Sequence, residues 1–85
     1  MRGPSVDVLG ARYDPQDPLG SLFSALSFGT PHFLEFVNLV RASQEMKNQI
    51  KEAFGKLPES SRRSILKMIK SSVHRDELEE VLDHE

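Results

Sequence analysis

The residues that could do chemistry are concentrated in the second half of the chain, where a basic segment is followed by an acidic one. Residues 41–75 carry nine lysines and arginines against three glutamates, and residues 76–85 carry six acidic residues and no lysine or arginine. A basic surface can hold the phosphates of a nucleic acid or of a membrane, whereas a neighbouring acidic segment can neutralise the same cations. The sequence leaves open which of these the basic segment contacts.

A helix over residues 58–73 would place several cations on one outer strip, because residues four and seven apart share a helix face. A helix over residues 44–55 would add two lysines. The helix at 58–73 offers no exposed aromatic residue for stacking on bases and no Asn or Gln for hydrogen bonds to base edges, which disfavours sequence-specific recognition. The candidate anion-binding residues are Lys47, Lys51, Arg62, Arg63, Lys67 and Lys70.

The histidines do not form a recognisable catalytic or metal-binding pattern. His74-Arg75-Asp76 matches three letters of the protein-kinase catalytic loop, which works only within a much larger two-lobed fold. Glu80 and His84 stand four residues apart and could give two metal ligands on a helix, fewer than a working site needs. We therefore expect no catalytic residue, no metal and no cofactor.

Length and composition point to a small intracellular domain. The chain has 85 residues, enough for one domain with a modest core but too few to enclose a large substrate cleft. It has no cysteine, which excludes disulfides, thiolate zinc sites and cysteine nucleophiles, and fits a reducing compartment. Neither a secretory signal nor a membrane-spanning run is expected. We predict a cytoplasmic location, with a nuclear one left open.

Turn and capping residues predict where ordered structure begins and how it is divided. Residues 1–16 mix Gly, Pro and isolated apolar residues without a sustained period, which predicts a flexible N-terminal arm before a single helical domain at 17–85. Gly29 is expected to end the first helix. After Ser71-Ser72 the sequence is compatible with either a fifth short helix or a continuation of the fourth. Helix starts are expected at Asp17-Pro18, Thr30-Pro31, Ser43 and Pro58.

Apolar residues recur at helical spacing in each segment, and no alternating pattern of useful length indicates a strand. The fold class is therefore all-α: a small bundle or short array of four to five amphipathic helices. The second helix, with a broad apolar stripe, is expected at the centre of the core. Five stripes exceed what so small a bundle covers, which predicts an exposed groove or dimer seam. The candidate protein-interaction residues are Phe36, Leu39, Met68, Val81 and Leu82.

Two segments, PHFLEF at residues 31–36 and LPESSRR at 57–63, resemble the helix pairs of HEAT-type solenoid proteins, whose helices similarly start with proline and join through short turns. The resemblance spans about residues 30–73. It implies a scaffold that binds other proteins.

The favoured function is that of a non-enzymatic protein–protein interaction module, a scaffold or adaptor or a self-associating protein. The alternative is a small nucleic-acid-binding protein that uses the basic faces of the helices at 44–55 and 58–73. The two hypotheses differ in whether binding is carried by apolar side chains or by phosphate contacts.

Overall fold

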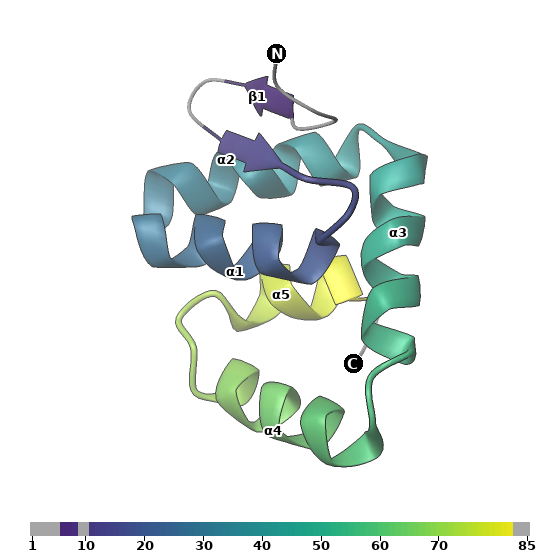
Figure 1. The fold of residues 1–85 in the computed structure, drawn as a ribbon. Coiled ribbons are helices and arrows are strands. Elements are labelled where there is room, and N and C mark those ends of the chain that lie inside the picture. The colour runs from purple at the N-terminus through teal and green to yellow at the C-terminus, as the bar shows by residue number, and fades with distance from the viewer. Residues whose placement is uncertain (1–5, 9–10, 83–85) are drawn as a thin grey trace.

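The protein is described by a computed structural model, which defines residues 6–8 and 11–82, with only the backbone defined at 6–8, 11 and 12. Five helices follow a short pair of strands within this part of the chain, which confirms the predicted all-α class (Figure 1). The fifth helix is separate from the fourth. The elements are β1 Val6–Val8, β2 Ala11–Tyr13, α1 Pro18–Phe28, α2 Thr30–Arg41, α3 Gln44–Gly55, α4 Glu59–Lys70 and α5 Arg75–Leu82.

The strand pair is a feature that the sequence pattern did not predict. β1 and β2 are antiparallel, with Val6 opposite Tyr13, and strands of three residues are too short for alternation to be recognised. Tyr13 is only 2% exposed, and its ring centroid lies 6.1 Å from that of Phe36. The flexible arm predicted for residues 1–16 falls partly outside the described residues, and the packed chain already includes Tyr13.

Local capping explains the helix boundaries. The Asp17 side chain accepts a hydrogen bond from the backbone N–H of Gly20 at 3.0 Å, and Ser43 Oγ accepts one from Met46 N–H at 3.2 Å. Each side chain satisfies a donor that the first turn of a helix leaves free. Gly29 ends α1 with φ +115°, a backbone conformation that side chains with a Cβ disfavour. These three predicted boundaries are confirmed.

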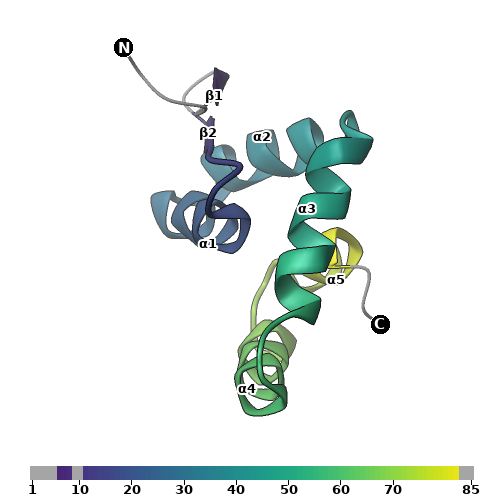
Figure 2. The same cartoon turned by 45° about the vertical axis from the view of Figure 1, so that its right-hand side comes forward.

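The core is built around α2, which packs against α1, α3, α5 and β2. It contributes Phe33, Phe36, Val37 and Val40, all at most 1% exposed. α5 packs against α2 and α3, whereas α4 packs mainly against α5. Figures 1 and 2 agree that α4 lies beyond the C-terminal end of α3, away from α1, α2 and the strands. One helix is therefore set apart from the centre of the fold.

Candidate functional site

α4 is the helix whose apolar face is least covered. Of its twelve residues, all described, Ile69 alone is buried. Ile65 and Leu66 are half-buried against the core, and Met68 is 45% exposed. Pro58 and the first-turn carboxylate of Glu59 favour the start of this helix, and its last turn is basic, which complements the helix dipole. The result is a stable amphipathic helix that leaves much of its side-chain surface accessible.

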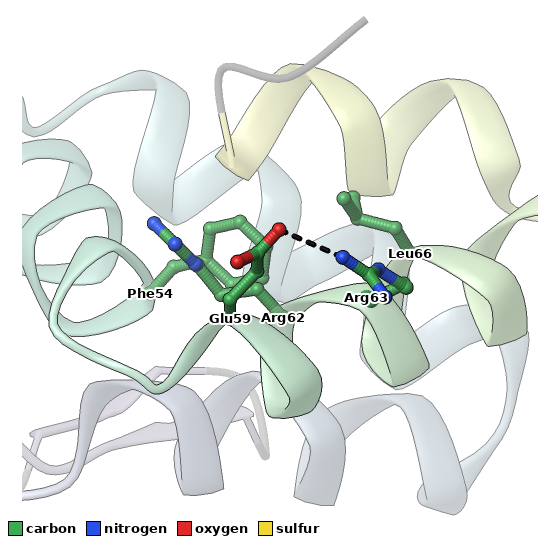
Figure 3. A pocket seen from close by; sticks show the side chains of 5 residues that line it. All are labelled: Phe54, Glu59, Arg62, Arg63 and Leu66. Atoms are coloured by element: carbon green, nitrogen blue, oxygen red, sulfur yellow. Dashed lines mark hydrogen bonds and ion pairs between the residues drawn. The ribbon is translucent and has the colours of Figure 1, made fainter.

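A hollow of about 250 Å³ opens between the end of α3 and the start of α4. Its apolar part consists of the Phe54 ring and the Leu66 side chain, and Figure 3 shows the Glu59 carboxylate in front of the Phe54 ring. Arg62 and Arg63 extend to opposite sides of that carboxylate. The hollow is smaller than the roughly 300–1,000 Å³ of typical small-molecule pockets. Its size suits one or two side chains of a partner.

Three cations of α4 lie on its exposed side, and the fourth lies on its inner face. Arg63 Nη2 lies 2.7 Å from Glu59 Oε2, and Lys67 and Lys70 are exposed on the same side of the helix. Arg62, expected beside this strip, is instead half-buried and lines the hollow. The cause is the helical period, which puts Arg62 three residues before Ile65 and four before Leu66, on the inner face.

The two α3 lysines among the candidate anion-binding residues are Lys47 and Lys51. Lys47 is half-buried, and it is close enough to Glu80 to lower the pKa of that carboxyl. Lys51 is exposed and lies one turn further along the same helix. The structure thus directs Lys47 towards α5, while it gathers Arg62 and Arg63 around the hollow.

In the described residues, the acidic segment forms its ion pairs with arginines outside α4. Arg41 Nη2 and Nε contact the two carboxylate oxygens of Glu80 at 2.7 and 2.9 Å, which joins the end of α2 to α5. The Arg41 hydrogen bond holds the pKa of Glu80 below its usual value and raises the pKa of Arg41. Glu79 accepts from Arg75 within α5 at 3.2 Å. Among the residues whose side chains are described, no ion pair joins an α4 cation to α5.

The structure separates the five predicted interaction residues. Phe36, Val81 and Leu82 are buried in the core, so in the folded chain they are not accessible to a partner. Leu39 is half-buried, and Met68 is exposed on α4. The apolar stripe of α2 is covered by α1, α3, α5 and β2, and that of α5 by α2, α3 and α4. The sequence alone does not reveal this, because it does not say which helices face one another. Met68 is the member of the set that remains on an open surface.

Three exposed apolar residues were missed by the sequence reasoning: Leu34, which is 40% exposed on α2, and Phe28 and Val73 at two turns. Phe28 is 68% exposed at the end of α1, where its ring stacks on His32, and Val73 is 91% exposed in the turn before α5. The two turns are linked, because Thr30 Oγ1 lies 3.2 Å from His74 Nε2. Thr30 was expected to cap α2, but its side chain makes this contact with His74 and no capping hydrogen bond. The sequence signal for the exposure of Phe28 was its position directly before Gly29, the residue that ends α1.

Metal-binding geometry is absent from the described residues, which contain no group of three or more His, Asp or Glu side chains placed to hold an ion. Of the pair considered from the sequence, Glu80 is engaged by Arg41, and His84 lies outside the described residues. His74 packs against the ring of Phe33 with centroids 4.7 Å apart. The Thr30 hydroxyl lies 3.2 Å from His74 Nε2, but among the described residues no carboxylate is hydrogen-bonded to the His74 ring to complete a catalytic triad.

Burial and hydrogen bonding also affect Tyr13. Its hydroxyl donates to Gln49 Oε1, and burial raises its pKa, with Glu45 and Asp14 adding to the effect. This residue ties β2 to α3 and has a structural role.

Within residues 6–8 and 11–82, no helix is long and apolar enough to cross a membrane.

Comparisons with protein-family models, with curated proteins and with solved structures found no match to this chain. The resemblance to HEAT-type helix pairs therefore stays a prediction.

Proposed function

We propose that the protein is a non-enzymatic protein–protein interaction module that presents α4 and the end of α3 to its partner. The observation that carries this proposal is the poorly covered apolar face of α4. It has one buried residue, two half-buried aliphatic side chains and an exposed methionine, and it lies beside a hollow. Apolar surface next to a pocket is where binding energy in protein interfaces is concentrated. A scaffold or adaptor role, in the cytoplasm, is consistent with this surface and with the HEAT-like pattern.

The test is affinity capture from source cells with a variant that alters α4 without touching the core. Met68→Glu adds a charge to the exposed apolar position, and Gln16→Glu adds the same charge at an exposed position outside the helices. We expect a captured protein that survives nuclease treatment, is lost with Met68→Glu and is retained with Gln16→Glu. If the captured protein is a second copy of the chain, sedimentation of the purified protein will show a dimer. Equal capture by both variants would contradict the proposal.

The second candidate function is nucleic-acid binding by the basic side of α4. The observation that favours it is the exposed strip of Arg63, Lys67 and Lys70, which is not neutralised by α5 in the described residues. Glu59 opposes it, because this carboxylate lies within the strip and would repel phosphates. Phosphate contacts would make binding fall steeply with salt.

Removing the acidic segment is not a usable test of this alternative, since α5 supplies Leu78, Val81 and Leu82 to the core. The exposed Asp76 and half-buried Glu77 can be changed to Asn and Gln instead. Salt-dependent binding of short DNA or RNA duplexes or single strands that strengthens in this variant would support nucleic-acid binding. Absence of binding at low salt would eliminate it.

A further inference from the structure

The hollow at the start of α4 combines an apolar floor with a cationic rim. Phe54 and Leu66 offer carbon surface, and the guanidinium groups of Arg62 and Arg63 border it. An arginine has five N–H donors, so Arg63 can keep its contact with Glu59 and still bind another carboxylate. A ligand for this place needs an apolar group to enter the hollow and negative charge beside it.

The rim continues along the helix. Arg63, Lys67 and Lys70 stand four and three residues apart on one exposed side, a row of roughly 10 Å at 1.5 Å per residue. α4 carries four cations against the single carboxylate of Glu59. A row of this length matches two or three carboxylates on a peptide, and electrostatic complementarity of this kind selects partners and speeds association.

Two features distinguish a peptide from the other polyanions that a basic helix can attract. The strip offers no aromatic side chain on which a base could stack, whereas the hollow provides an apolar socket that a phosphate backbone would not fill. Met68, 45% exposed on α4, adds a soft apolar surface that adapts to different side chains.

We propose that this hollow and the cationic row bind an acidic peptide segment: an apolar anchor residue enters over Phe54 and Leu66, and flanking carboxylates contact Arg62, Arg63 and Lys67. The proposal rests on the proposed interaction function and specifies its partner class. Glu59 acts as a built-in competitor, because its carboxylate occupies part of the cationic rim before the partner arrives.

The experiment is an unbiased selection of random 12-residue peptides displayed on phage, with the full chain immobilised. We expect the enriched peptides to carry a Leu, Ile or Phe anchor flanked by at least two Asp or Glu residues. A synthetic fluorescent copy of the most enriched peptide then serves as the probe, and changes in backbone amide NMR shifts locate its binding site. Shifts centred on α3's last turn and α4 are expected.

Three variants give the sign of the electrostatic contribution. Lys67→Gln should weaken binding of that probe about threefold, the scale of a charge at the rim of an interface. Glu59→Gln should strengthen it by a similar factor, because the competing carboxylate is gone. Gln16→Glu lowers the net charge by the same amount as Lys67→Gln at a site outside α4 and should leave the affinity unchanged. Thermal unfolding of each variant checks that it remains folded.

The outcomes separate this inference from the proposed function. Enriched peptides that bind α4 without acidic residues, or a probe whose affinity is unmoved by Lys67→Gln and Glu59→Gln, would overturn the acidic-partner inference and leave the interaction surface standing. Peptides whose NMR shifts lie away from α4 would overturn both. Displacement of the acidic probe by a short DNA or RNA at low salt, with higher affinity than the probe itself, would assign the row to a nucleic acid instead.

Discussion

α2 and α4 are helices of equal length, twelve residues each, with opposite roles. α2 buries four large apolar side chains between α1, α3, α5 and β2, whereas α4 buries Ile69 and packs mainly against α5. Both helices are amphipathic, but α2 has six large apolar residues and α4 has four, so the difference comes from the width of the apolar stripe as well as from the number of neighbours. α2 therefore holds the fold together, and α4 is positioned to present side chains.

The largest effect is expected from truncation in α2. Phe36→Ala should lower the free energy of unfolding by about 3–5 kcal/mol, because Phe36 is fully buried and its loss leaves a cavity. This is a large share of the roughly 5–15 kcal/mol by which small domains are stable. Chemical denaturation measures it. Leu34→Ala, at a position of the same helix that is 40% exposed, is the matched control and should cost much less.

A smaller effect is expected from the single buried residue of α4. Ile69→Ala should cost about 2–3 kcal/mol, at the low end for such changes, because a helix with one main neighbour can shift to close part of the cavity. Ile65→Ala, at a half-buried position one turn earlier, should cost less. If urea denaturation shows that Ile65→Ala lowers the free energy of unfolding more than Ile69→Ala does, the described packing of α4 is wrong.

The ion pair that joins α2 to α5 should give a pH-dependent contribution. The pKa of Glu80 is lowered in the folded chain, so its stabilisation is fully present above the unfolded-state value and is lost as the pH falls through the lowered pKa. Glu80→Gln should therefore be less stable than the natural chain at about pH 7, and this difference should be smaller at about pH 3 because Glu80 is protonated as the pH falls through its lowered pKa. Denaturation midpoints at both pH values measure this. A difference that is as large in acid as at neutral pH would contradict the assignment to charge.

The smallest effect on stability is expected at Met68. Met68→Ser should change the free energy of unfolding by no more than about 0.5 kcal/mol, because the side chain is 45% exposed on α4. The same substitution should weaken partner binding if the surface acts as proposed. A large loss of stability in thermal or chemical denaturation would show instead that Met68 serves the core.

Local signals made much of this fold predictable. Asp17, Gly29 and Ser43 determine helix ends through hydrogen bonds and backbone conformation within a few residues, so their roles can be identified in the sequence. The broad stripe of α2 predicted a central helix and so the burial of Phe36, which its selection as an interaction residue overlooked; the burial of Val81 was not predictable, since it depends on which apolar stripes meet in three dimensions. The short strands and the buried Tyr13 were missed because each strand has only three residues.

The candidate site illustrates the same division. The strip of Arg63, Lys67 and Lys70 follows from helical spacing and is exposed as expected. Arg62 was expected beside that strip, although its spacing to Ile65 and Leu66 already places it on the inner face. The hollow over Phe54 could not be predicted, because it arises from the angle between α3 and α4, which no local pattern encodes.

The most direct test of α4 as the interaction surface is site-specific photo-crosslinking in source cells. A photoreactive amino acid is placed at Met68 on α4, or at the exposed Asn38 on α2 as the matched position, in otherwise identical chains. We predict discrete, nuclease-resistant protein adducts from position 68 and none from position 38. Adducts from position 38 alone, or equal adducts from both, would contradict the assignment of α4 as the surface that meets the partner.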